Sequence, residues 1–169
     1  MIRKYNGINL RVPGDGSPST ATSSAIDSLA QSVFIPANTF EVGDCIRIRA
    51  AFSKTATVST AFDVKLFWNT TNSVTGATQL AIYNSLSSDT SISLYRTMTF
   101  KSGNQAFLYS TGTSIVEDTG LSGTVVSGVT LSNINITTDG YIMSSVQRRV
   151  ASGGRTEDTI RGFYLTVEV

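Results

Sequence analysis

The chain has 169 residues, a formal net charge of +1 and only 15% charged residues, while hydrophobic residues make up 40%. This length suits one domain with a single core. The near-neutral charge argues against a nucleic-acid partner or an acidic membrane surface, because the protein has no strong field to attract either. Ser and Thr replace the missing charge at roughly a quarter of positions, and β-branched Thr favours strands.

The inventory of reactive side chains is small. Histidine is absent and Cys45 is the single cysteine, which excludes Ser-His-Asp and Cys-His catalysis, His-ligated zinc and an intrachain disulfide. Local carboxylate pairs such as Glu41 with Asp44 remain, but acidic residues in such turns are ordinarily solvent-exposed turn formers. A hydrolase built on a carboxylate pair is therefore the last-ranked hypothesis. We expect no enzyme activity, no metal and no cofactor.

The sequence also bears on the compartment. It contains no apolar run of about 18 residues, so we expect no membrane insertion. The first residues, from Met1 to Asn6, lack the apolar segment of a signal peptide. These features predict a protein that accumulates inside a cell, and they do not indicate where it later works.

Residues 1–30 differ from the rest of the chain. Pro13 and Pro18 lie in a run of turn-forming residues. We interpret 1–30 as an extended N-terminal arm, with a disordered terminus as the alternative. Its small apolar foothold is the candidate attachment site: Ile8, Leu10 and Val12. Residues 31–169 then form the folded domain.

From Gln31 onward, apolar and polar residues alternate with a period of two, which predicts half-buried strands. Trp68 continues the inward face of the 62–69 run, and Phe67 points outward. Two alternating runs predict core positions: Ile46, Ile48, Ala50 and Phe52, then Phe62, Val64 and Leu66. Later runs cover 79–84, 91–101, 105–110, 124–138, 141–146 and 159–169.

Turn sequences link these runs. Residues 101–104, Lys-Ser-Gly-Asn, predict a hairpin, and Asp139-Gly140 predicts another that pairs 134–138 with 141–146. About eight antiparallel strands without helices predict an all-β fold, namely a β-sandwich of the jelly-roll type. The Cys…Trp…Cys framework of an immunoglobulin-like sandwich is absent.

Several aromatic residues lie opposite the main apolar stripes of their strands: Phe67, Tyr83, Tyr95 and Tyr164. A soluble monomer seldom exposes a large apolar patch. These residues therefore predict either a subunit interface in a closed homotrimer or a surface that contacts glycans.

Residues 35–50, IPANTFEVGDCIRIRA, resemble an opening hairpin of tailed-phage virion proteins, in which a strand, a turn and a second strand begin a jelly-roll domain. The similarity in style extends over residues 31–169. The resemblance implies a homotrimeric β-sandwich on a bacteriophage virion, with an N-terminal arm that contacts a capsid or tail protein. It transfers no functional residues, because the shared positions are turn and core positions.

The leading hypothesis from the sequence is a non-enzymatic virion structural protein, either a capsid decoration protein or a head fibre, anchored by residues 1–30. The alternative is a tail-associated module that binds a receptor or a host surface glycan. The absence of a coiled coil, a repeated shaft and a second domain favours the first hypothesis over a full tail fibre.

Overall fold

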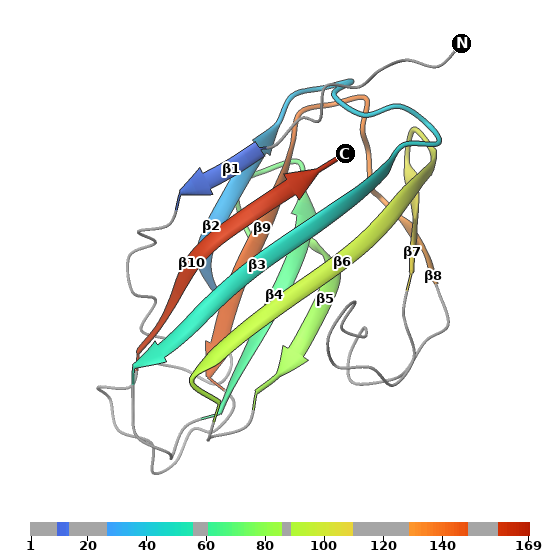
Figure 1. The fold of residues 1–169 in the computed structure, drawn as a ribbon. Coiled ribbons are helices and arrows are strands. Elements are labelled where there is room, and N and C mark those ends of the chain that lie inside the picture. Colours follow the sequence, from blue (N-terminus) through green and yellow to red (C-terminus); the bar gives the residue numbers. More distant parts are fainter. Residues whose placement is uncertain (1–9, 14–26, 56–60, 86–88, 110–128, 149–158) are drawn as a thin grey trace.

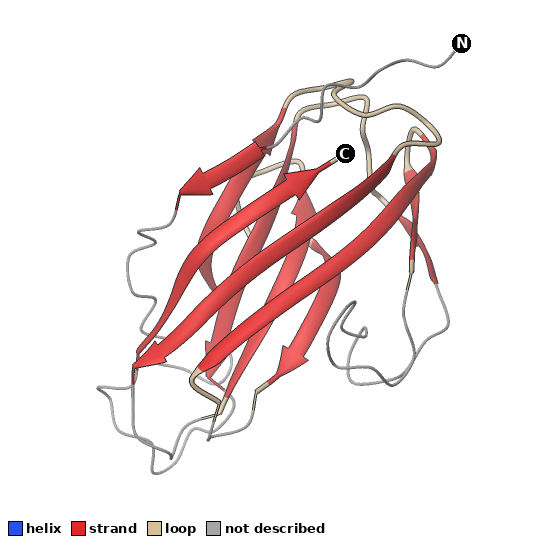
Figure 2. Ribbon diagram, in the orientation of Figure 1, coloured by secondary structure: helices blue, strands red, loops and turns tan. Residues whose placement is uncertain are grey.

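The computed structural model describes residues 10–13, 27–55, 61–85, 89–109, 129–148 and 159–169. Within these ranges every regular element is a strand (Figure 2), and no helix could cross a membrane. The strands are β1 (Leu10–Pro13), β2 (Ser28–Ile35), β3 (Cys45–Thr55), β4 (Phe62–Asn69), β5 (Thr78–Asn84), β6 (Ser91–Ser102), β7 (Gln105–Leu108), β8 (Val129–Ser132), β9 (Gly140–Arg148) and β10 (Thr159–Glu168).

The strands form two antiparallel sheets that pack face to face (Figure 1). The six-stranded sheet has the order β1-β10-β3-β6-β7-β8, and the four-stranded sheet has the order β2-β9-β4-β5. The predicted antiparallel β-sandwich is therefore confirmed. The structure describes more strands than the expected eight, because β1 and β2 are additional strands: β1 pairs with β10 and β2 pairs with β9.

The strand pairs are nested along the chain. β1 pairs with β10, β2 with β9, β3 with β6 and β4 with β5, and successive pairs alternate between the two sheets. This nesting is the strand order of a jelly roll, in agreement with the prediction. β7 and β8 extend the six-stranded sheet beyond β6.

The core lies between the sheets and follows the predicted alternation. The runs at 45–53 and 62–69 were predicted to turn alternate residues inward, and all of those residues are buried. Trp68 is one of them, with an exposed fraction of 1%. Each large apolar side chain buried in this way contributes about 1.5–3 kcal/mol. Alternation also turns Arg96 inward on β6, where its Nη1 donates to the carbonyl oxygen of Tyr109 at 3.1 Å.

The opening segment at 34–50 is not a hairpin. β2 and β3 belong to different sheets, and residues 36–44 arch from one to the other. Phe40 explains the arch, because its buried ring stacks on Phe100 with 5.0 Å between centroids. The backbone N–H of Gly43 also donates to the carbonyl oxygen of Phe100 at 2.8 Å. The two strands predicted on either side of this turn are confirmed, but the prediction that they pair with each other is wrong.

The predicted hairpin at Asp139-Gly140 is also wrong, whereas the one at 101–104 joins β6 and β7 as expected. β8 lies in the six-stranded sheet and β9 in the four-stranded sheet, so residues 133–139 cross between the sheets. Ile134 and Ile136 are buried in the core along this crossing. Asp139 lies at the end of this crossing, where its Oδ1 accepts the backbone N–H of Ala37 in the 36–44 arch at 2.9 Å.

Part of the expected arm belongs to the sandwich. β1 pairs with β10 through Leu10 opposite Val167 and Val12 opposite Leu165. β2 begins at Ser28, three residues before the expected start of the domain at residue 31. Ile8 lies outside the described residues. Deleting residues 1–30 would remove β1 and the first three residues of β2, so it would not isolate an arm.

Candidate functional site

A pocket of about 320 Å³ lies at the end of the sandwich where three connections meet, the upper end in Figure 1. The β4–β5 loop (70–77), the β6–β7 turn (103–104) and the β8–β9 crossing (133–139) contribute to it, together with the adjoining strand ends. Its lining consists of one indole, four amides, two hydroxyls and a glycine: Trp68, Asn69, Asn104, Asn133, Asn135, Thr70, Thr78 and Gly76. The lining therefore carries no formal charge.

The β4–β5 loop is held by Asn69. Its Nδ2 donates to the carbonyl oxygen of Ser73 at 2.8 Å, and its Oδ1 accepts the N–H of Thr70 at 2.8 Å. Gly76 has a φ of 72°, a conformation that glycine adopts at no steric cost. Asn69 thus shapes the rim of the pocket.

The β8–β9 crossing is fixed from both sides. The N–H of Ile136 donates to the carbonyl oxygen of Gly103 at 3.0 Å, and the N–H of Asn38 donates to the carbonyl oxygen of Ile136 at 2.8 Å. Asn135 Oδ1 accepts both the N–H and the hydroxyl of Thr137, at 2.9 and 2.8 Å. These bonds connect the crossing to the β6–β7 turn and to the 36–44 arch, so the pocket wall is preorganised.

Trp68 forms the inner wall of the pocket. Its ring packs so closely on Gly140 that a Cβ at that position would lie 2.6 Å from Cζ2. The indole Nε1 is buried and has no hydrogen-bond partner in the described part of the chain. A buried donor without a partner costs about 1–3 kcal/mol.

The pocket offers hydrogen bonds rather than reactive groups. Asn104 and Asn133 are exposed, and neither side-chain amide bonds to another described residue. Each amide presents both a donor and an acceptor, a combination that suits ligands rich in hydroxyl or acetamido groups. Among the described residues, no group of three or more Asp, Glu, Cys or His could hold a metal ion.

The structure separates the four aromatic residues that the sequence grouped together. Phe67 lies outside the main core cluster, yet only 6% of it is exposed. Tyr83 lies opposite the core residue Val64 and packs against the core, so it does not face outward as expected. Tyr95 and Tyr164 lie on the outward face of the six-stranded sheet and are half-buried. None of the four lines the pocket.

The hydroxyl of Tyr83 donates to Asp89 Oδ2 at 3.1 Å. Burial raises the pKa of Tyr83 above its ordinary value of 10.0, and the hydrogen bond and negative charge of Asp89 raise it further. Since the folded-state pKa is the higher one, the stabilising contribution is complete below about pH 10 and is lost as pH rises toward that raised pKa.

We expect Tyr83→Phe to be less stable than the wild type by about 1 kcal/mol at neutral pH, because one hydrogen bond is lost. This difference is expected to shrink above about pH 10. Urea unfolding of both proteins between neutral and alkaline pH measures it. A difference that stays constant across this range would contradict the assignment.

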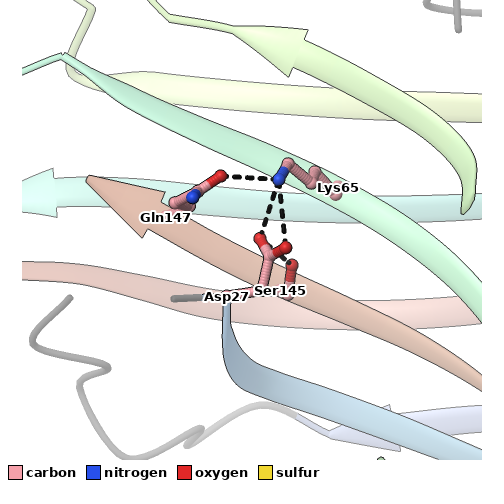
Figure 3. A network of polar contacts seen from close by, with 4 residues as sticks. All are labelled: Asp27, Lys65, Ser145 and Gln147. Atoms are coloured by element: carbon pink, nitrogen blue, oxygen red, sulfur yellow. Dashed lines mark hydrogen bonds and ion pairs between the residues drawn. The ribbon is translucent and has the colours of Figure 1, made fainter. Parts of the chain in front are cut away.

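A second polar cluster lies on the outward face of the four-stranded sheet (Figure 3). Lys65 Nζ lies 3.0 Å from both carboxylate oxygens of Asp27 and donates to Gln147 Oε1 at 2.6 Å. The hydroxyl of Ser145 donates to Asp27 Oδ1 at 3.2 Å. The Lys65 and Asp27 side chains are 10% and 24% exposed. This network joins Asp27, which precedes β2, to Lys65 on β4 through two side chains of β9. We interpret the network as structural.

No family model matches the chain, and no curated protein matches it. Among solved structures, the chain is similar to the CBM2 module of the evolved Dit of Lactobacillus casei BL23 phage J-1. The TM-score is 0.41 and the sequence identity is 10%, over 89% of this chain and 74% of that one.

Proposed function

We propose that this chain is a non-catalytic module of a bacteriophage virion that binds a neutral saccharide in the pocket at the end of its sandwich. The observation that carries the proposal is the pocket lining, in which amides surround a buried indole and no charged side chain takes part. Neutral sugars present many hydroxyl groups, and a site of this kind satisfies them with paired donors and acceptors.

The virion part of the proposal rests on the sequence. The resemblance of residues 35–50 to the opening of phage jelly-roll domains supports it, and the nested strand order agrees with that expectation. The pocket favours the binding module over the capsid decoration protein, because decoration requires only a surface that docks on the particle.

The homotrimer remains a prediction, and fewer outward aromatic residues now support it. It was inferred from outward aromatic residues, but Phe67 is buried and Tyr83 packs against the core. The large apolar side chains exposed among the described residues are Leu29, Phe34, Val42 and Tyr109. Attachment through residues 1–30 to a capsid or tail protein likewise remains a prediction.

The proposal is tested by probing the full chain on an array of neutral glycans and confirming each hit by titration calorimetry. We expect binding to neutral saccharides in the micromolar to millimolar range, or about −4 to −8 kcal/mol. A blank array from protein that shows a cooperative thermal unfolding transition would refute the proposed function.

A further inference from the structure

The accessible positive charges of the described chain gather on one face. Six Lys and Arg residues have described side chains, and three of them are buried: Lys54, Lys65 and Arg96. The other three are Arg47, Arg49 and Lys101, of which Arg47 and Lys101 are exposed and Arg49 is half-buried. All three lie on the outward face of the six-stranded sheet. Alternation along β3 already places Arg47 and Arg49 on one face, but no local pattern indicates that Lys101 on β6 joins them.

Strand register places these cations beside aromatic rings. Arg49 lies opposite Tyr95 on β6, and its guanidinium carbon is 5.0 Å from the centroid of that ring. Lys101 Nζ is 5.4 Å from the ring centroid of Phe107 on β7. The Phe107 ring in turn meets Tyr109 edge-on at 5.0 Å, and 43% of Tyr109 is exposed. We call these residues the cationic–aromatic face: Arg47, Arg49, Tyr95, Lys101, Phe107 and Tyr109.

Negative charge on this face is sparse. Glu168, opposite Arg47 on β10, is the one carboxylate that the described strands of this sheet place there. No ion pair joins Arg47 or Arg49 to a described carboxylate. The remaining described acidic residues lie in connections or on the four-stranded sheet: Asp27, Glu41, Asp44, Asp63, Asp89 and Asp139. Among the side chains that the structure describes, the accessible cations and most of the carboxylates therefore lie on different parts of the surface.

This combination fits an acidic polysaccharide. Aromatic rings supply apolar platforms for sugar rings, while guanidinium and ammonium groups pair with carboxylate or phosphate substituents. A nucleic acid is a poorer match, because duplex DNA carries one charge per about 1.7 Å of helix axis, a density that a chain with a net charge of +1 does not neutralise. A glycan with about one acidic group per repeating unit presents a comparable sparse charge.

We propose that the cationic–aromatic face is a second glycan-binding surface, separate from the neutral pocket, that takes an acidic polysaccharide bearing carboxylate or phosphate groups. The proposal does not depend on the pocket, since no residue of this face lines it. Because part of the attraction is between exposed charges, binding weakens as salt screens them.

The test is calorimetric titration of the full chain with oligogalacturonate and with poly(glycerol phosphate), each at low and at high salt. We expect at least one of the two anions to bind, and to bind several-fold more weakly at high salt. Whichever binds identifies the acidic group. The triple variant Arg47→Gln/Arg49→Gln/Lys101→Gln should bind at least tenfold more weakly.

Two controls keep the test specific. The pocket variant Asn104→Ala should retain wild-type affinity for the anion, and thermal unfolding should show that the triple variant is folded. If the triple variant does not fold, the single variant Arg47→Gln at its exposed site replaces it and should show a smaller loss in the same direction. The proposal is overturned if neither anion binds, if dextran binds equally well, if oligo(dT) binds more tightly than both anions, or if the folded variant retains full affinity.

Discussion

The double variant Asn104→Ala/Asn133→Gly should bind a neutral saccharide roughly tenfold or more weakly than the wild type. Each hydrogen bond to the ligand contributes about 0.5–1.5 kcal/mol, and 1.4 kcal/mol corresponds to a factor of ten. Glycine is chosen at Asn133 because φ there is 67°, a conformation in which alanine would be strained. Titration calorimetry with a saccharide identified on the array provides the measurement.

The matched control for this variant is Asn84→Ala. Asn84 is an exposed amide at the far end of β5 from the pocket, and we expect its removal to leave the affinity unchanged. Equal losses from both variants would mean that the saccharide binds elsewhere. Unchanged affinity in the double variant would remove the amide pocket from the proposed function.

Gly140→Ala should lower the free energy of unfolding by about 1–3 kcal/mol, the usual cost of overpacking a core. The added Cβ would lie 2.6 Å from Cζ2 of Trp68, a fully buried ring with little room to move. Because Trp68 is also the inner wall of the pocket, we expect saccharide affinity to fall together with stability. Urea unfolding and calorimetry on the same protein measure both quantities.

Gly103→Ala is the comparison for this substitution. Gly103 lies at the same end of the sandwich, but its nearest neighbour to an added Cβ is Thr137 Cγ2 at 3.3 Å, a methyl group on an exposed residue. We expect a change of less than about 1 kcal/mol. If Gly140→Ala were equally mild, the Trp68 wall would be more adaptable than its packing indicates.

Local patterns predicted a large part of the fold. Alternation identified the inward residues of β3 and β4, including Trp68, and the sequence Lys-Ser-Gly-Asn marked the β6–β7 turn. These local patterns did not reveal which connections cross from one sheet to the other, because an arch and a hairpin begin with the same turn residues. Phe40 in the 36–44 arch and Ile136 in the 133–139 crossing favour an arch over a hairpin, because burying each of them requires its connection to pass over the core.

The candidate site was harder to predict. Of its four asparagines, Asn69 ends β4, and the other three lie in the β6–β7 turn and the β8–β9 crossing, far from it in the chain. Each amide, taken alone, is typical of an ordinary turn. The sequence did suggest a surface that contacts glycans, but it assigned that contact to Phe67, Tyr83, Tyr95 and Tyr164 rather than to the pocket beside Trp68. A bulge between Leu66 and Phe67 in the β4–β5 register also limits what alternation alone can place.

The sequence by itself determined the all-β class, the jelly-roll type of sandwich, most of the core and the absence of histidine-based chemistry. These follow from residue type and a period of two, which act within each strand. Only the tertiary structure brought Asn104, Asn133 and Trp68 to one pocket and Arg47, Arg49 and Lys101 to one face. The physical reason is that strand order and register set those neighbours, and both depend on burial between distant segments rather than on any local pattern.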